Sequence, residues 1–314
     1  MNTQKSFIGV DIGGTATKIA LVDQKGYLSD FVSIKTNDDK KQRKEFLSHV
    51  YVEISKIIAK SANDVGGIGV SLLGLQMNDQ SGTLFSANAP GFNKFDIRKV
   101  LKSHFNLPVV VSNDLTAHAQ AEYRFGVGKA SNRFLSVAMG TGIGCTMIID
   151  GKPVILFGGT TGDCGRIILD SKSNIVCGGG VRGSAEALCG TGGIEYLAKK
   201  YYGSDSSYCA RDIITSARDE NDDVSIKIIE EVGRHLGHLI ANLSVIFFPD
   251  TIALTGGTVE SGKVLVDSCK KQFQNMVGDF FNGLYETVGL EKIQIQKAEM
   301  GKDAGIVGAV VPFL

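Results

Sequence analysis

The sequence predicts an α/β protein made of two similar halves. Its 314 residues and 33.5 kDa exceed what one compact core usually holds, so two domains, or one split by a deep cleft, are expected. Strand-like apolar runs alternate with helix-like amphipathic segments along the chain. A pattern of strand, glycine turn and strand also occurs twice, far apart, and such a distant internal repeat favours two halves of similar fold.

The first copy of the repeat lies near the N-terminus, where the turn Gly13-Gly14-Thr15 separates two apolar runs. In the second copy, the turn Gly140-Thr141-Gly142 separates two further apolar runs. Aligned without gaps, Val10–Asp23 matches Val137–Asp150 in pattern, including the closing aspartate. Each copy is therefore predicted to form strand, tight turn and strand.

Between the two copies the pattern alternates between helix and strand. Apolar residues between Phe46 and Ile58 fall on one helical face, and Ile68–Leu73 has the composition of a buried strand. The β-branched run Pro108–Ser112 stops at Asn113-Asp114, and the alanine-rich segment Thr116–Phe125 favours a helix. Ligands of open α/β sheets bind at the carboxyl ends of strands, so Asn113-Asp114 is well placed for chemistry.

The second half contains a long helix and a third glycine turn. Apolar residues recur at helical spacing over Val224–Phe248, and Pro249 ends the pattern. The strand Thr251–Leu254 then enters the turn Thr255-Gly256-Gly257-Thr258. Glycines at such turns let backbone N–H groups approach phosphate oxygens, although each turn taken alone also fits an ordinary hairpin. The chain has neither a Walker loop nor a dinucleotide fingerprint leading into a helix, so hydride transfer is not predicted.

Composition excludes several classes of partner. Lys and Arg total 33 against 33 Asp and Glu, and the pI of about 6.9 gives no electrostatic reason to bind nucleic acid or an anionic membrane. The six cysteines show neither Cys-x-x-Cys pairs nor zinc spacing, which fits reduced thiols. No signal core and no apolar stretch long enough for a membrane span are present. A cytoplasmic location is expected.

Four ordered motifs resemble those of the ROK family of sugar kinases, in the actin/hexokinase/Hsp70 superfamily. They are Ile8–Lys18, Val111–Ala117, Met139–Gly144 and Leu254–Gly257, similar in order to the phosphate-1, catalytic, phosphate-2 and adenosine motifs. The resemblance continues to Ala309. It implies two actin-like (ribonuclease H-like) α/β domains around a central cleft that binds ATP and Mg²⁺. We expect a first domain of residues 1–111 plus 301–314 and a second of residues 112–300.

The resemblance also implies roles for individual residues. Asp114 matches the catalytic base that takes the proton from a sugar hydroxyl as that oxygen attacks the γ-phosphate, which agrees with the needs of phosphoryl transfer. A helix N-cap is the alternative role for Asp114. Asp11 matches the acidic residue near Mg²⁺, acting through water. The implied ATP and phosphate site comprises Asp11, Gly13, Gly14, Thr15, Thr17, Lys18, Gly140, Thr141, Gly142, Gly256 and Gly257.

The implied sugar site departs from the family pattern. Asn88, Asn113 and Glu186 match sugar-binding positions, beside Asp114 itself. Where many members carry Gly-Glu-x-Gly-His, this chain has Asp163 in place of the glutamate and Arg166 in place of the histidine. Arg166 could face the sugar, pair with Asp163 or point away, and the sequence leaves all three open.

The zinc motif of those members is also reduced here. Of its four ligands only Cys177 is present, and one thiolate cannot hold a structural zinc that needs four ligands. We expect no zinc at this position and a cysteine that only packs.

The function that the resemblance implies is ATP-dependent phosphorylation of the primary (6-) hydroxyl of a hexose, glucokinase-like. An N-acetylhexosamine kinase, for N-acetylglucosamine or N-acetylmannosamine, or a glucoside kinase is the alternative. A non-catalytic sugar sensor or transcriptional regulator is the alternative from another class, because some members carry an N-terminal winged helix-turn-helix. The first strand begins within ten residues here, which leaves no room for one. The expected partners are sugar, ATP and a second copy in a homodimer.

Overall fold

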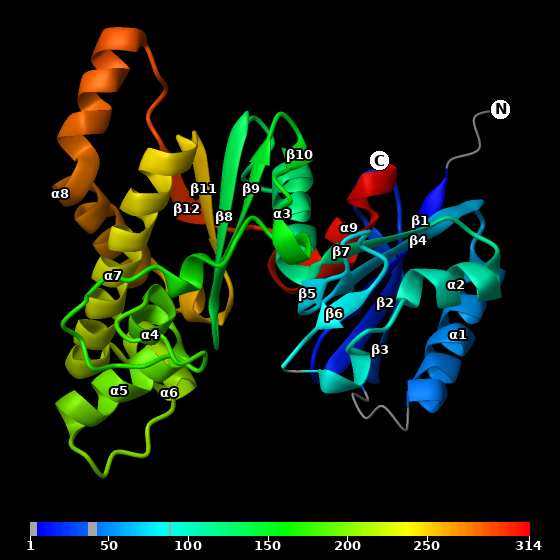
Figure 1. Cartoon of the computed structure of the whole chain (residues 1–314), viewed down its shortest axis with the longest axis horizontal. Coiled ribbons are helices and arrows are strands. Elements are labelled where there is room, and N and C mark those ends of the chain that lie inside the picture. The colour runs from blue at the N-terminus through cyan, green and yellow to red at the C-terminus, as the bar shows by residue number, and fades with distance from the viewer. Residues whose placement is uncertain (1–4, 37–42, 88) are drawn as a thin grey trace. The chain divides into compact units, whose positions relative to one another are not determined.

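The computed structural model describes residues 5–36, 43–87 and 89–314 (Figure 1). The chain divides into two compact units. Unit 1 comprises Met1–Lys129, Gly151–Thr161 and Glu299–Leu314, and unit 2 comprises Ala130–Asp150 and Gly162–Ala298. Both units mix sheet and helix, as the α/β prediction requires.

These units differ from the predicted domains in three segments. Residues 112–129, 151–161 and 299–300 belong to unit 1, whereas the predicted boundaries put them in the second domain. For the first and longest segment, the reason is packing of the helix Asp114–Phe125 against the C-terminal helix Ala304–Val310. Gly308 lies so close to the backbone of Ala117 that an added Cβ would overlap the Ala117 carbonyl. Tight packing of two helices thus keeps the helix after Asp114 with unit 1.

Unit 1 is a five-stranded sheet with helices. The strands lie in the order β3-β2-β1-β4-β7; the pairs β1–β2 and β2–β3 are antiparallel, and β1–β4 and β4–β7 are parallel. Apolar residues on the buried faces of these strands and of α1 form one core cluster. The elements are β1 (Ser6–Ile12), β2 (Ala16–Val22), β3 (Leu28–Lys35), α1 (Arg43–Lys60), β4 (Val65–Leu72), β5 (Leu75–Gln76), β6 (Thr83–Phe85), α2 (Ile97–Phe105), β7 (Val109–Asn113), α3 (Asp114–Phe125), β10 (Lys152–Pro153) and α9 (Ala304–Val310).

Unit 2 repeats this plan with longer helices. Within it the strands lie in the order β9-β8-β11-β12, with β8–β9 antiparallel and the other two pairs parallel. The two longest helices, α7 and α8, pack side by side (Figure 1). The elements are β8 (Arg133–Met139), β9 (Ile143–Ile149), α4 (Ala185–Cys189), α5 (Thr191–Tyr202), α6 (Ala210–Thr215), α7 (Asp223–Phe247), β11 (Thr251–Thr255), α8 (Lys263–Val288) and β12 (Gln294–Lys297).

The predicted repeat is present as two hairpins. β1 and β2 join through residues 13–15, and β8 and β9 join through residues 140–142, with strand boundaries that coincide in the ungapped alignment. The long predicted helix is α7, which ends one residue before Phe248; this residue adopts a left-handed conformation ahead of Pro249. In the part of the chain that the structure describes, no helix is long and apolar enough to cross a membrane.

Candidate active site

Asp11 occupies the middle of the unit 1 sheet, between polar residues on both neighbouring strands. The register places Lys18 of β2 and Ser71 of β4 opposite Asp11. Ser71 donates its hydroxyl to Asp11 Oδ1 at 2.8 Å, and Lys18 Nζ lies 3.9 Å from Asp11 Oδ2. Lys18 also donates to the carbonyl of Lys302 at 2.8 Å. The Asp11 side chain is only 14% exposed, so these contacts fix a largely buried carboxylate.

The C-terminal helix α9 forms the floor beneath this carboxylate. A Cβ added to Gly305 would lie 2.5 Å from Asp11 Cγ, so a side chain at this position would displace the carboxylate. Sequence reasoning assigned no role to Gly305, Ser71 or Lys302. The Ser71 contact could have been found, because a serine inside the otherwise apolar strand Ile68–Leu73 marks the site of a polar partner.

Asp114 is the first residue of α3 and follows β7 directly. The helix cap is Asn113, whose Oδ1 accepts a hydrogen bond from the Leu115 N–H at 3.0 Å. Asn113 Nδ2 donates to the Gly74 carbonyl at 2.9 Å. Asn113 is therefore the N-cap, a role that we considered for Asp114, and it holds the start of the helix on the sheet. Asp114 itself makes the first turn of the helix.

Burial raises the pKa of the Asp114 carboxyl to about 6, opposed by the Leu115 N–H and assisted by the negative charge of Asp11. A general base works best when its pKa lies near the operating pH. At neutral pH this carboxyl group is mostly ionised, and the carboxylate is a stronger base than that of an ordinary aspartate. Its position and its pKa therefore both suit proton abstraction.

His118 lies one helical turn after Asp114. The side chain is half-buried, and burial lowers the pKa of its imidazole; Asp11 opposes this shift and Lys18 adds to it. The ring is therefore neutral at neutral pH. These electrostatic effects place His118, Asp11 and Lys18 in one neighbourhood of unit 1.

The first glycine turn is tight and open to solvent. Gly13 N–H donates to the Ala16 carbonyl at 3.1 Å, and Gly14 and Thr15 are exposed. Thr17 differs from the other residues of the motif: its side chain is fully buried, and its hydroxyl pairs with that of Thr36 at 2.8 Å. The backbone of the turn can approach a phosphate, but the Thr17 side chain is part of the core.

The second glycine turn, which lies in unit 2 at residues 140–142, is anchored from two sides. Gly140 N–H donates to the Gly142 carbonyl at 3.0 Å, and the Gly140 carbonyl accepts from Thr191 N–H at 3.1 Å. Glu186 of α4 lies against the turn: its Oε2 accepts from Ile143 N–H at 3.4 Å. A Cβ on Gly142 would lie 2.7 Å from that oxygen. Thr141, at the tip, is exposed.

Arg166 joins Glu186 to two other side chains, and we call Asp163, Arg166, Cys177 and Glu186 the Arg166 cluster. Arg166 Nε donates to Asp163 at 3.2 Å, and Nη1 donates to Glu186 at 2.7 Å and to Cys177 Sγ at 2.7 Å. Gly179 leaves room for the guanidinium, because an added Cβ would lie 2.6 Å from Arg166 Cζ. Of the three arrangements that the sequence left open, the structure has the pairing with Asp163.

Cys177 does more than the packing role that we expected. Burial alone would raise the pKa of its thiol, but hydrogen bonds from Ser184 and from backbone N–H groups, together with the charge of Arg166, lower that pKa below its ordinary value. The sulfur is thus an acceptor for the guanidinium. Among the described residues, no group of three or more His, Cys, Asp or Glu side chains is arranged to hold a metal ion.

The third glycine turn closes against β8. Gly256 has φ +96°, and a Cβ there would overlap the Met139 backbone, whereas a Cβ on Gly257 would meet open space. This turn therefore needs glycine at its first position for a close approach of backbone to backbone. Asn88, the other predicted sugar-binding residue, lies outside the described residues.

Comparison with known proteins covers nearly the whole chain. The model of the ROK family matches residues 7–313. A glucokinase of Halalkalibacterium halodurans is 27% identical, over 96% of this chain and 93% of that protein. The N-acetylgalactosamine kinase AgaK of Shewanella sp. is also 27% identical, over 97% and 96%. The crystal structure of a ROK family glucokinase from Streptomyces griseus in complex with glucose and AMPPNP matches with a TM-score of 0.75 and 25% identity, over 97% of both chains.

Proposed function

The chain belongs to the ROK family, and from that premise we propose that it is an ATP-dependent sugar kinase that phosphorylates the primary, 6-hydroxyl of a hexose, as a glucokinase does. The observation that carries the proposal is Asp114, a carboxylate with a raised pKa at the end of β7. The glucokinase and N-acetylgalactosamine kinase among the relatives support the same class of reaction.

In the proposed reaction, Asp114 accepts the proton of the sugar hydroxyl as that oxygen attacks the γ-phosphorus of ATP. The new oxygen–phosphorus bond forms while the bond from phosphorus to the bridging oxygen of ADP breaks. The chain supplies little covalent chemistry in such a transfer; it positions the reactants and neutralises charge. The N–H groups of the turns at residues 13–15 and 140–142 would bind the phosphates, and Gly256 and Gly257 would flank the adenosine.

Asp11 is the residue that would hold Mg²⁺. Ser71 occupies Oδ1 and Lys18 lies at the edge of ion-pair distance, so Oδ2 is available for a water of the ion's hydration shell. Mg²⁺ keeps several waters and needs only one or two carboxylates besides phosphates, so a single fixed carboxylate fits it. When bound, the ion supplies positive charge against the phosphate oxygens. Asp11 also keeps the pKa of Asp114 high through its own negative charge.

The Arg166 cluster favours a second candidate substrate, an N-acetylhexosamine. The guanidinium already takes up Asp163 and one oxygen of Glu186, so these carboxylates are poor acceptors for a sugar hydroxyl. Within the described part of the chain, the hydrogen bonds of the guanidinium use Nε and Nη1 but not Nη2, and the Arg166 side chain is 34% exposed. Donors of this kind suit a carbonyl oxygen such as that of an acetamido group.

The homodimer and the cytoplasmic location stay predictions.

The test is release of ADP from Mg-ATP in the presence of glucose, mannose, fructose, N-acetylglucosamine, N-acetylmannosamine, N-acetylgalactosamine or cellobiose. We expect turnover on one sugar that falls by roughly 10²–10⁴-fold in Asp114→Asn, because the base is lost and the fold is not. Asp267→Asn, on an exposed part of α8, is the matched control and should keep full activity. Sugar binding without turnover in the wild-type protein would contradict the kinase and favour a sugar sensor.

A further inference from the structure

Unit 1 contains a pocket that the proposed reaction does not use. It has a volume of about 560 Å³, within the range of small-molecule sites. Its lining includes the four consecutive residues Val109–Ser112 of β7. Successive side chains of a strand point to opposite faces, so four consecutive lining residues place the pocket along the edge of β7 and not on a face of the sheet. This edge is the last in the sheet order of unit 1.

The edge offers backbone groups for pairing. Ile68 N–H donates to the Pro108 carbonyl at 2.9 Å, so Pro108 and, by alternation, Val110 and Ser112 direct their backbone groups toward β4. The N–H and C=O groups of Val109 and Val111 then point to the free edge. A strand edge of this kind is a template for one more extended segment.

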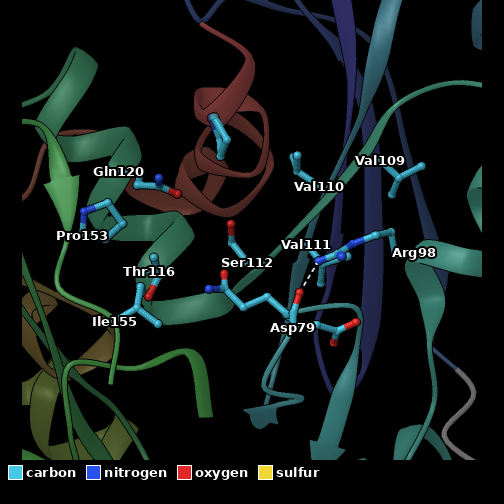
Figure 2. A pocket seen from close by; sticks show the side chains of 12 residues that line it. Asp79, Arg98, Val109, Val110, Val111, Ser112, Thr116, Gln120, Pro153 and Ile155 are labelled. Atoms are coloured by element: carbon cyan, nitrogen blue, oxygen red, sulfur yellow. Dashed lines mark hydrogen bonds between the residues drawn. The ribbon is translucent and has the colours of Figure 1, made fainter. Parts of the chain in front are cut away.

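Two buried polar atoms lie at opposite ends of the pocket. Gln120 of α3 is only 9% exposed, and its Oε1 is buried with no hydrogen-bond partner among the described residues. Arg98 of α2 has a buried Nε in the same state, while its Nη2 donates to the Asp79 carbonyl at 2.6 Å. Figure 2 shows Gln120 on one side with Pro153 and Ile155, and Arg98 on the other beside Asp79. Unmet groups of this kind are costly, which points to a missing partner.

We propose that this pocket binds a short extended peptide with a free carboxylate. The carboxylate pairs with the Arg98 guanidinium at one end, and the peptide amides pair with the Val109 and Val111 backbone along β7. An N–H of the peptide donates to Gln120 Oε1 at the other end. Apolar side chains pack on Pro153 and Ile155. The occupied pocket contacts α3, the helix that begins at Asp114.

The probe is the tripeptide Val-Ala-Leu with a free carboxylate, titrated into the full-length protein by calorimetry. Two matched peptides remove one contact each: the C-terminal amide lacks the anion, and the version N-methylated at alanine lacks an edge donor. We expect each to bind at least tenfold more weakly than the parent. Hydrogen exchange should show protection of the Val109 and Val111 amides by the parent peptide only.

Two protein variants test the ends of the pocket. Gln120→Leu removes an unpartnered acceptor, so it should leave the melting temperature unchanged or raised while weakening peptide binding at least tenfold. Arg98→Gln should do the same to binding and abolish the preference for the free carboxylate. Gln274→Leu, at an exposed position of α8, is the control. Three outcomes would each overturn the proposal. The first is equal binding of all three peptides, and the second is binding that survives both variants. The third is no binding of the parent peptide at concentrations up to about 10 mM.

A second binding experiment distinguishes two sources of the peptide, the C-terminus of a partner protein and a free small peptide. The same three residues are placed at the end of a twelve-residue glycine-serine peptide. Binding as tight as that of the tripeptide assigns the pocket to the C-terminus of a partner protein. Binding of the tripeptide alone assigns it to a free small peptide. Both results support the proposed chemistry.

Discussion

The two hairpins have the same backbone, but only the one in unit 1 carries charged side chains at the matching strand positions. In the ungapped alignment, Asp11 corresponds to Ala138 and Lys18 corresponds to Cys145. In unit 1 the ion pair is built into the strands and fixed by their register. In unit 2 the same positions are uncharged, and the carboxylate near the turn comes from Glu186 of α4. The hairpin is therefore a scaffold, and each unit takes its charge from a different source.

The difference also concerns how each carboxylate is held. Asp11 is held by neighbouring strands and by the floor of α9, so its position follows from the sheet itself. Glu186 is held by Arg166, a residue in the irregular segment after β9. A site held by a sheet should tolerate little change, whereas one held by a single arginine should fail when that arginine changes.

Replacing Asp11 by alanine, the residue at the equivalent position of the unit 2 hairpin, gives the largest effect expected from this comparison of hairpins. Asp11→Ala removes the charge that Mg²⁺ would need, and we expect kcat to fall about 10²-fold or more, in the range for loss of a transition-state charge contact. Steady-state kinetics with Mg-ATP measure it. Ala138→Ser in the other hairpin is the control, with activity within about twofold of the wild type on the scale of ordinary surface changes. Full activity in Asp11→Ala would remove the proposed role of this residue.

Asp114 should make the stability of unit 1 depend on pH. Its pKa in the fold, about 6, lies above the ordinary value of 3.8, so the folded state favours the protonated form. The stability that the protonated Asp114 contributes is present at low pH. It is lost as the pH rises through about 6, which lowers the free energy of unfolding by roughly 3 kcal/mol. Asp114→Asn should thus exceed the wild type in free energy of unfolding at pH 8 and match it at pH 4. Urea titrations measure it.

The same carboxyl should shape the pH profile of the reaction. Activity of the wild type is expected to rise with pH along an acid limb centred near pH 6, because only the ionised form accepts a proton. A limb near pH 4 would show that burial does not perturb Asp114.

Arg166→Met should break the site in unit 2. It leaves Asp163 and Glu186 without their counter-charge, and we expect roughly 1–3 kcal/mol of lost stability, discounted from the cost of breaking a fully buried pair because the side chain is partly exposed. The KM for sugar should rise about tenfold or more, while the KM for ATP changes little. Arg218→Met, which removes an exposed ion pair with Asp219, is the matched control. An unchanged KM for sugar would show that the Arg166 cluster has no part in recognition.

Thr17→Val gives the smallest expected effect and sharpens the comparison within one hairpin. It leaves the Thr36 hydroxyl buried without a partner, at a cost of about 1 kcal/mol. The double variant with Thr36→Val should recover most of that loss. The KM for ATP should not change, because the Thr17 side chain lies in the core. A raised KM for ATP would instead restore the phosphate-binding role that the motif implies.

The sequence predicts the regular parts of this molecule well, because they repeat. The two hairpins, the strand before Asp114 and the long helix α7 follow from periodicity and turns, and the Asp11–Lys18 contact follows from the register of one hairpin. The Arg166 cluster does not, because it joins residues of an irregular segment that has no period. The boundary near Val111 is equally hidden, since it depends on the packing of α3 against α9, far along the chain.

The order in which the ribosome makes the chain sets a limit on how the molecule can assemble. Unit 2 ends at Ala298, whereas unit 1 needs Glu299–Leu314, which follows all of unit 2 along the chain. Until α9 emerges, Asp11 lacks its floor and α3 lacks its packing partner. All segments of unit 2 are therefore synthesised before unit 1 can complete its core, and the uncovered sheet of unit 1 is a surface to which a chaperone can bind in that interval.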